Sequence, residues 1–346
     1  MTERMVGKPS PSRLERILGN SFGSPSPRIL VGPGPGLDAA VLDIGNGRIM
    51  AVAEDPIFPA PNLPFEMMGW LTVHIGASDV AVTGVRPEFM TYTLLLPGSS
   101  SEMDARTLVK AISCAAKGLG ISIVGGHTGW YDAVALPIVG GVTVWGTAPY
   151  GQWVSPGGAK SGDWILMTKG PSIEAAALLT VLYREKLRHR IEPHVMERLA
   201  GRVKEITVVK DALTAFGVGG IHAMHDATEG GVLGGLWEMH ASSGLPVQVD
   251  LDSVAVPEDI KLLGLALGFD PWKAISEGTL LVAVDPHYVD NVRKAWAKID
   301  IESHILGRFD ASLGRNTILR NGVAEDLPEP DVDPFWDLFF AGLRSS

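Results

Sequence analysis

The chain has 346 residues, more than one compact core usually holds, which predicts two domains. Its formal net charge is −10 and no dense Lys/Arg run occurs, which argues against a nucleic-acid partner, because phosphate neutralisation needs a basic face. The single cysteine excludes an internal disulfide. The sequence contains no run of about 18 apolar residues, so no membrane span is predicted. We therefore expect a soluble, cytoplasmic protein without nucleic-acid or membrane partners.

Residues 1–150 are predicted to form one α/β domain. A loose arm over 1–12 is followed by a short helix that contains Leu14. An extended segment, a glycine loop at 32–36 and a hairpin that turns at 45–47 come next. Helical spacing covers 66–82 and 102–119, and the single cysteine, Cys114, is expected to be buried in the second of these helices. Strands are predicted over 91–97, 121–126 and 135–147, and their alternation with helices indicates a layered domain.

Turn residues concentrate near 149–162, so the second α/β domain is predicted over 151–346. Strands are expected at 163–170, 279–285 and 304–309, and helices at 172–187, 194–216 and 286–298. The segment 225–244 is predicted to be a loop followed by a helix that Gly244 closes. The acidic and then aromatic tail after 326 is expected to dock on the surface.

The glycine loop GPGPG at 32–36 invites a dinucleotide-binding interpretation, with Glu54 or Asp55 as the ribose-binding acid. Pro33 and Pro35, however, lack the backbone N–H groups that a pyrophosphate would use, and a hairpin turn stands where the phosphate-binding helix should run. No G-x-x-x-x-G-K-[ST] sequence occurs, which excludes a P-loop.

Four aspartates lie beside small or glycine residues at the edges of predicted elements: Asp38, Asp55, Asp79 and Asp226. Magnesium takes oxygen ligands and shares them with nucleotide phosphates, so a magnesium site needs several carboxylates that converge. Neighbouring glycines let backbone amides approach phosphates closely. The alternative is that each aspartate forms a turn or caps a helix. Spacing alone leaves both interpretations open.

The motifs appear in the order found in the PurM-like, aminoimidazole ribonucleotide synthetase-related superfamily, which the chain resembles over nearly its whole length. They are GLDAAV at 36–41, ED at 54–55, SDVAVTGVRP at 78–87, GGHT at 125–128, GGAKSGDWILMTKG at 157–170, HDATEGG at 225–231 and SEGTLLVAV at 276–284. The phrases GGHT and MHDATEGGVLGGLWEM are most similar to HypE-like hydrogenase maturation relatives.

This resemblance implies a PurM-like two-domain α/β architecture, with an N-terminal domain that binds ATP and pairs as a homodimer. It implies phosphoryl transfer from ATP with Mg²⁺, often to a carboxamide-type oxygen. The implied metal ligands are Asp38, Asp55, Asp79, Asp226 and Glu54. The implied nucleotide contacts are Lys8, Gly36, Asp38, Gly125, Gly126, Thr128, Thr228, Gly230 and Gly231, and the implied catalytic residues are Asp226 and His127.

Several of these assignments have plainer alternatives. Lys8 is either a phosphate lid or a solvated lysine of the arm. His127, His222 and His225 together suggest a transition-metal site, but no further metal-binding motif accompanies the closely spaced His222 and His225. A contact of His127 with phosphate or substrate is therefore favoured. Trp130 either stacks on a base or packs.

The chain also departs from the family pattern. Leu37 replaces an acid, Glu54 replaces a threonine, and Gly129 follows GGHT where the family has an acid. Glu54 either restores the negative charge lost at Leu37 or points into solvent. The sequence ends in Leu343-Arg-Ser-Ser, whereas HypE needs a C-terminal cysteine, so we expect no nitrile formation on the tail. Two function hypotheses follow: an ATP-dependent enzyme that phosphorylates or dehydrates a small molecule or carboxamide-type group, or a nucleotide-binding scaffold or maturation partner with little turnover.

Overall fold

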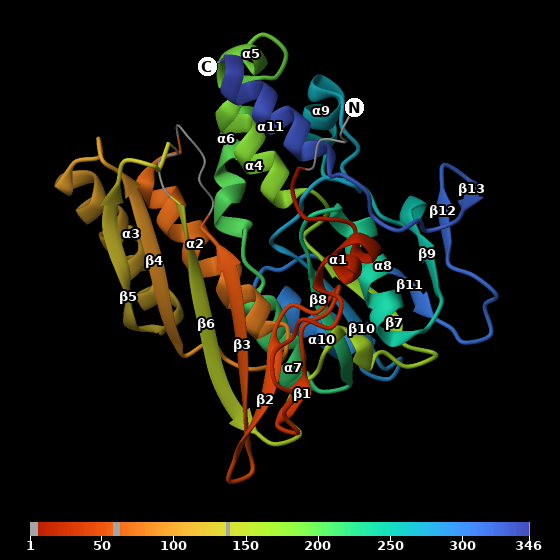
Figure 1. The fold of residues 1–346 in the computed structure, drawn as a ribbon. Coiled ribbons are helices and arrows are strands. Elements are labelled where there is room, and N and C mark those ends of the chain that lie inside the picture. The colour runs from red at the N-terminus through yellow and green to blue at the C-terminus, as the bar shows by residue number, and fades with distance from the viewer. Residues whose placement is uncertain (1–5, 58–62, 136–138, 346) are drawn as a thin grey trace. The chain divides into compact units, whose positions relative to one another are not determined.

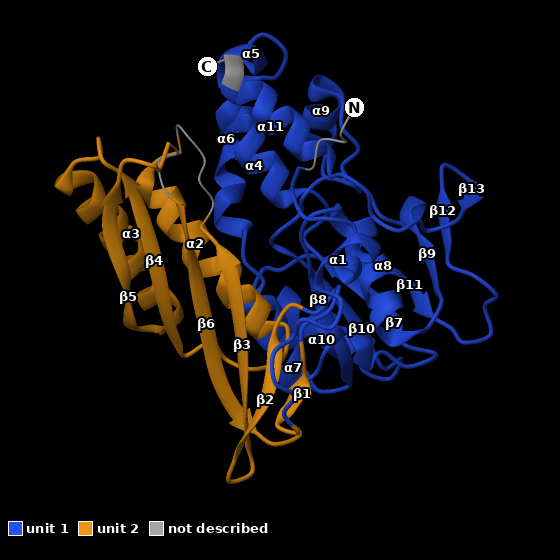
Figure 2. Cartoon of the chain, viewed as in Figure 1, with its two compact units in different colours: residues 1–26, 33–37, 154–346 blue, residues 27–32, 38–153 orange. Residues whose placement is uncertain are grey.

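The computed structural model describes residues 6–57, 63–135 and 139–345, with the side chains of 344–345 left out. The chain divides into two compact units, which Figure 2 shows in different colours. Unit 1 comprises Met1–Ser26, Pro33–Leu37 and Val154–Ser346, and unit 2 comprises Pro27–Gly32 and Asp38–Trp153. The N-terminal arm and most of the glycine loop thus pack in the unit that holds the second half of the chain.

Unit 2 is built on a six-stranded sheet in the order β1-β2-β3-β6-β4-β5. Neighbouring strands are antiparallel, except for the parallel pair β4 and β5. The predicted hairpin joins β2 and β3 through Asn46 and Gly47, which have φ of 52° and 68°, the left-handed backbone that such tight turns require. The strands are β1 (Ile29–Val31), β2 (Ala40–Gly45), β3 (Arg48–Pro56), β4 (Phe89–Pro97), β5 (Ser122–Tyr131) and β6 (Val139–Pro149).

Two helices of unit 2 pack on each other, α2 (Phe65–Ala81) and α3 (Glu102–Leu119), and α2 also contacts β3 and β6 (Figure 1). The sequence sets both ends of α3: Ser101 and Asp104 form a reciprocal capping box, and Gly120 ends the helix with φ 74°. Cys114 lies in α3 but is exposed, so the expectation of a buried cysteine was wrong. The buried stripe of α3 runs through Leu108 and Ile112, and Cys114 is rotated away from it.

Unit 1 is built on a seven-stranded sheet in the order β13-β12-β9-β11-β7-β10-β8. Its pairs are antiparallel, except β12 with β9. The strands are β7 (Trp164–Thr168), β8 (Ile221–Ala227), β9 (Val247–Asp250), β10 (Thr279–Val284), β11 (Ser303–Phe309), β12 (Thr317–Arg320) and β13 (Val323–Glu325). The helices of four or more residues are α1 (Pro11–Leu18), α4 (Ile173–Leu182), α5 (Arg184–Leu187), α6 (Pro193–Gly201), α7 (Val209–Val218), α8 (Gly231–Ser243), α9 (Glu258–Leu267), α10 (Val289–Ala297) and α11 (Pro334–Ser345), with 3-10 turns at Pro156–Gly158, Arg202–Glu205 and Leu251–Ser253.

The helix predicted over 194–216 was wrong as a single element, because it is α6, a 3-10 turn and α7. The tail forms α11, which contacts α4 and buries Phe335 completely. The aromatic tail is therefore part of the core of unit 1. No helix among the described residues is long and apolar enough to cross a membrane.

Candidate functional site

In unit 2, the carboxylate of Asp55 on β3 lies against α2. A Cβ built on Gly76 of α2 would sit 3.7 Å from Asp55 Oδ2, an ordinary van der Waals distance, so this carboxylate lies beside Gly76. Asp79 follows Gly76 by three residues and therefore lies on the same face of α2. The sheet and the helix thus bring two of the four predicted aspartates to one place.

Asp38 belongs to the same end of the sheet. It stands two residues before Ala40, which pairs with Val52 on β3, while Asp55 stands three residues beyond Val52. Because β2 and β3 are antiparallel, Asp38 and Asp55 leave the strand pair at the same end. In unit 2, Asp55 and Asp79 therefore lie at the β3–α2 contact, and Asp38 lies at the same end of the β2–β3 pair.

Glu54 does not join this group, so its assignment as a ligand beside Asp55 is corrected. Successive side chains of a strand point to opposite faces of the sheet. Asp55 faces α2, whereas Glu54 is exposed on the other face, where its Oε2 accepts a hydrogen bond from the hydroxyl of Thr143 on β6. A carboxylate on that face does not replace the one lost at Leu37.

The segment Gly125–Gly126–His127–Thr128 lies on β5 at the edge of the sheet, and these four residues are exposed. A Cβ on Gly126 would overlap the carbonyl oxygen of Tyr92, so this position needs glycine for close strand packing. His127 Nε2 lies 2.7 Å from the hydroxyl of Tyr131. The indole of Trp130 donates to the carbonyl of Ser100 and remains 44% exposed, so packing does not occupy its whole surface.

In unit 1, His225 and Asp226 are consecutive residues of β8, not of a loop as predicted, and both are buried. His225 shares its face of the strand with Ala223 and Ala227, which belong to the core under α8. A ring nitrogen of His225 and a carboxylate oxygen of Asp226 lie within 4.8 Å of each other.

A buried glutamate of α8, Glu238, links His225 to the N-terminal arm. Its Oε2 lies 2.9 Å from His225 Nε2, and its Oε1 lies 3.5 Å from Lys8 Nζ. Burial alone would raise the pKa of Glu238, but the Lys8 charge and the hydrogen bond from His225 outweigh it and lower the pKa from 4.5 to about 2. Glu238 is therefore ionised near neutral pH, and His225 Nε2 is the donor of their hydrogen bond.

Gly36, a predicted nucleotide contact, packs directly on this glutamate. Its φ is +68°, and an added Cβ would lie 2.7 Å from the Cβ of Glu238. The glycine loop thus presses against α8, where any side chain at this position would displace Glu238.

The start of α8, where the amides of Gly230 and Gly231 were predicted to meet a phosphate, is engaged by the chain itself. Gly230 N donates to Asp333 Oδ2 at 2.7 Å, and Gly231 N donates to the carbonyl of Thr228 at 3.0 Å. Glu229 Oε2 accepts from both Lys8 N and Trp336 Nε1, each at 2.7 Å. The arm and the tail thus meet at this helix end, and the amide of Gly230 reaches a phosphate only if Asp333 moves.

Asp333 also holds the start of α11, because its Oδ1 accepts from Phe335 N at 2.8 Å. Burial raises the pKa of Asp333 from 3.8 to about 7, although hydrogen bonds from the backbone amides of Phe335, Gly230 and Ile275 oppose this rise. Asp333, which accepts the hydrogen bond of Gly230 N at the start of α8, therefore changes its charge near neutral pH.

The histidines do not form a common site. His222 and His225 lie on opposite faces of β8, and His222 Nδ1 pairs with Asp163 at 2.8 Å. His225 pairs with Glu238 instead.

Two family models match the chain in sequence order. The AIR synthase related protein N-terminal domain matches residues 36–148, and the AIR synthase related protein C-terminal domain matches residues 160–316. Together these segments cover most of the chain. The chain belongs to the AIR synthase related family.

Curated members of the family are similar over most of their length. Carbamoyl dehydratase HypE of Cupriavidus necator is 26% identical over 285 residues, which cover 81% of this chain and 76% of that protein. Selenide, water dikinase of Escherichia coli is 29% identical over 333 residues, which cover 89% and 92%.

Solved structures of other proteins share the fold of this chain. A HypE–HypF complex contains a chain with a TM-score of 0.71 and 22% identity, covering 92% of this chain and 99% of the other. HypE in complex with ATP has a TM-score of 0.65 and 21% identity, covering 94% and 96%. The predicted PurM-like two-domain α/β architecture is thereby confirmed.

Motif comparison with the AIR synthase related family missed two residues, Glu238 and Asp333. Glu238 had a visible signal, since it is the sole acid in the helix Gly231–Ser243 and lies on its mainly apolar first part. Asp333 precedes Pro334, which is typical of a helix start, but nothing local indicated its bond to Gly230, 103 residues away.

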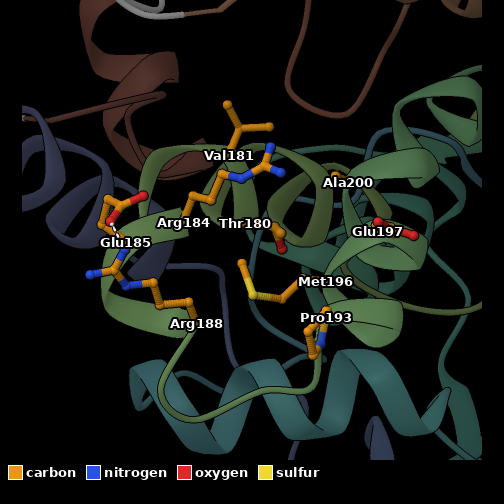
Figure 3. Close-up of a pocket in the computed structure, with 9 residues that line it drawn as sticks. All are labelled: Thr180, Val181, Arg184, Glu185, Arg188, Pro193, Met196, Glu197 and Ala200. Atoms are coloured by element: carbon orange, nitrogen blue, oxygen red, sulfur yellow. Dashed lines mark ion pairs between the residues drawn. The ribbon is translucent and has the colours of Figure 1, made fainter.

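A cavity of about 340 Å³ between α4, α5 and α6 contains none of the residues predicted for the site (Figure 3). Its lining carries equal numbers of cations and acids, Arg184 and Arg188 with Glu185 and Glu197, and Arg188 pairs with Glu185 at 2.7 Å. This cavity is not part of the candidate site.

Proposed function

We propose that this protein is a magnesium- and ATP-dependent enzyme that transfers a phosphoryl group from ATP to an oxygen of a small molecule or a carboxamide-type group. Membership of the AIR synthase related family supports this, as do the relatives named carbamoyl dehydratase and selenide, water dikinase. A HypE structure of the same fold was solved in complex with ATP. Because ATP is the cosubstrate, we expect the reaction to take place in the cytoplasm.

The observation that carries the proposal is the placement of Asp55 against Gly76, one helical turn before Asp79, with Asp38 at the same end of the sheet. Carboxylate oxygens suit Mg²⁺, which is usually held by one or two carboxylates together with substrate phosphates. The donor set therefore fits magnesium, and Asp38, Asp55 and Asp79 would hold it. When bound, the ion neutralises charge on the phosphates during transfer.

The residues of unit 1 supply orientation and charge in this proposal. Glu238 fixes the proton of His225 on Nε2 and thereby sets the ring orientation beside Asp226. Asp226 contributes a further carboxylate to the metal or to phosphate-linked water, and Lys8 supplies a positive charge to phosphates. Thr228, Gly230 and Gly231 are proposed nucleotide contacts, with Gly230 available after Asp333 moves. His127, with Gly125, Gly126 and Thr128, contacts phosphate or substrate from the exposed strand.

Calorimetric titration with a non-hydrolysable ATP analogue at several magnesium concentrations tests the proposal. Asp55→Asn keeps the shape of the side chain and removes its charge, so we expect about tenfold or weaker binding that excess magnesium partly restores. Glu54→Gln is the matched control on the next residue of β3, and we expect it to retain the magnesium dependence of the parent. Equal affinities of the parent and Asp55→Asn would refute the metal assignment.

A second function, a nucleotide-binding scaffold or maturation partner with little turnover, is favoured by one observation. The amides of Gly230 and Gly231 already have acceptors within the chain, Asp333 and Thr228. A scaffold would bind Mg-ATP, but the rate of ADP formation with any candidate acceptor would equal the rate in buffer without protein. Multiple turnovers with one acceptor would exclude this alternative. The HypE–HypF complex makes a maturation-protein partner a reasonable candidate in either case.

We further propose a homodimer formed through unit 2. The expectation rested on the apolar segments 91–97 and 135–145, of which 136–138 lie outside the described residues. Leu94 and Leu96 are buried within the unit, whereas the edge strand β5 exposes Ile123, Val124 and Trp130. An open edge strand with apolar side chains is a surface that proteins usually cover by pairing.

A further inference from the structure

A positively charged pocket lies in unit 1 between the N-terminal arm, α1 and the tail. Its volume is about 290 Å³, and its lining contains three cations, Lys8, Arg13 and Arg16, against one acid, Asp331. The whole chain carries a formal charge of −10, so this local excess of positive charge runs against the composition of the protein. The cavity in Figure 3, in contrast, balances two arginines with two glutamates.

Helix α1 presents two of these cations together. Arg13, Arg16 and Ile17 follow the i, i+3, i+4 spacing and therefore share one face of the helix. Arg16 lines the pocket and forms no ion pair with any residue that the structure describes. A planar guanidinium in this position suits a phosphate or carboxylate group, which it binds through two parallel hydrogen bonds.

The remaining lining is apolar: Val6, Pro9, Ile17 and Val332 stand between the charged residues. Ile17 is 62% exposed, although apolar side chains are stabilised by burial. The pocket thus combines a cationic end with an apolar wall, which suits an anion attached to a short apolar body.

Lys8 connects this pocket to the candidate site. It lines the pocket and also an adjoining hollow formed with Glu229, Gly230 and Glu238. Lys8 thus lines the pocket, while its ammonium meets Glu238, the partner of His225.

We propose that this pocket binds the acceptor substrate and that the acceptor carries its own anionic group, a phosphate or a carboxylate, held by Arg13 and Arg16. This inference rests on the proposed function, because it assigns a chemical class to the acceptor of the phosphoryl group. In this proposal, the short apolar body of the acceptor lies on Ile17 and Val332, and the reacting end of the acceptor points toward Lys8.

Equilibrium titration of the full chain with phenyl phosphate tests the subsite, with benzoate as the carboxylate probe and phenol as the neutral one. We expect phenyl phosphate or benzoate to bind and phenol not to bind. Arg16→Gln should weaken anion binding about tenfold or more, because it removes the charge-assisted hydrogen bonds of the guanidinium. Arg106→Gln, an exposed helix arginine whose side chain is 73% accessible, is the matched control and should change nothing.

Each further outcome separates the subsite from the proposed function. Saturating non-hydrolysable Mg-ATP analogue should leave phenyl phosphate bound, and competition between them would assign the pocket to the nucleotide and overturn the inference. Equal anion affinity in the parent and Arg16→Gln, or no binding of either anion to the parent, would also overturn it. Failure of the parent to bind the Mg-ATP analogue, with anion binding that still depends on Arg16, would refute the proposed function instead.

Discussion

Asp333 offers a quantitative test of how the tail is tied to α8. Its two oxygens accept hydrogen bonds from Phe335 N and Gly230 N, and its side chain is buried. Burial raises its pKa from 3.8 to about 7. We predict that Asp333→Asn, which keeps the shape and removes the titration, changes how the stability of the protein depends on pH.

The direction follows from proton linkage. Between about pH 4 and pH 7 the folded protein holds a proton on Asp333 that the unfolded chain has released, so the free energy of unfolding falls as the pH rises. The contribution is fully present below 3.8 and is lost as the pH rises through about 7. At 1.36 kcal/mol per pH unit, the rise from 3.8 to about 7 corresponds to about 4 kcal/mol.

Urea unfolding of the parent and Asp333→Asn at intervals from pH 4 to pH 8 measures this effect. The asparagine loses one acceptor oxygen, but that cost is the same at every pH and cancels from the slope. The stability of the parent relative to the variant should fall by about 4 kcal/mol across the range. A difference that stays constant within about 1 kcal/mol would refute a buried, protonated Asp333.

Three further predictions concern other parts of the molecule. Gly36→Ala should lower the free energy of unfolding by about 1–3 kcal/mol, because the alanine would have a positive φ and would clash with Glu238. Gly19→Ala should lower it less, because Gly19 also has a positive φ but has open space around it. Urea unfolding measures both changes. Asp226→Asn should weaken Mg-ATP binding about tenfold while circular dichroism stays native, and unchanged affinity in calorimetry would contradict its role. Val124→Lys on the exposed edge strand should convert a dimer to a monomer in light scattering, and a parent that is already monomeric at micromolar concentration would contradict the dimer.

Local sequence signals predicted those elements whose ends are set by neighbouring residues. Helix α3 ends as expected because Ser101 and Asp104 form its cap and Gly120 adopts the left-handed backbone. The hairpin at 45–47 was predictable for the same reason.

The split of the helix predicted over 194–216 depends on distant residues. Lys169 Nζ donates to the carbonyl of Thr207 at 2.6 Å, and Arg202 binds the carboxylate of Asp259 at 2.9 Å. These contacts hold the segment between α6 and α7 away from an α-helical path. The helical spacing of the sequence carries no signal for them, because tertiary contacts override local propensity.

The candidate site shows the same division. Motif comparison predicts Asp55, Asp79 and Asp226 as ligands, and these assignments stay predictions. It also placed Glu54 beside Asp55, although successive residues of a strand face opposite sides of the sheet. The alternation was readable in the sequence once 48–56 was taken as a strand. The pairing of Asp333 with Gly230 was not readable, because it joins two helix starts that only the tertiary fold brings together.

The most direct test of the central claim is to measure manganese, a paramagnetic substitute for magnesium, by electron paramagnetic resonance. Titrating Mn²⁺ into the protein with a non-hydrolysable ATP analogue reports free and bound metal separately. We predict a site that appears only with the nucleotide, is lost in Asp55→Asn and Asp79→Asn, and persists in Glu54→Gln. Nucleotide-dependent Mn²⁺ binding that is the same in the parent and both aspartate variants would contradict the assignment of these carboxylates to Mg-ATP.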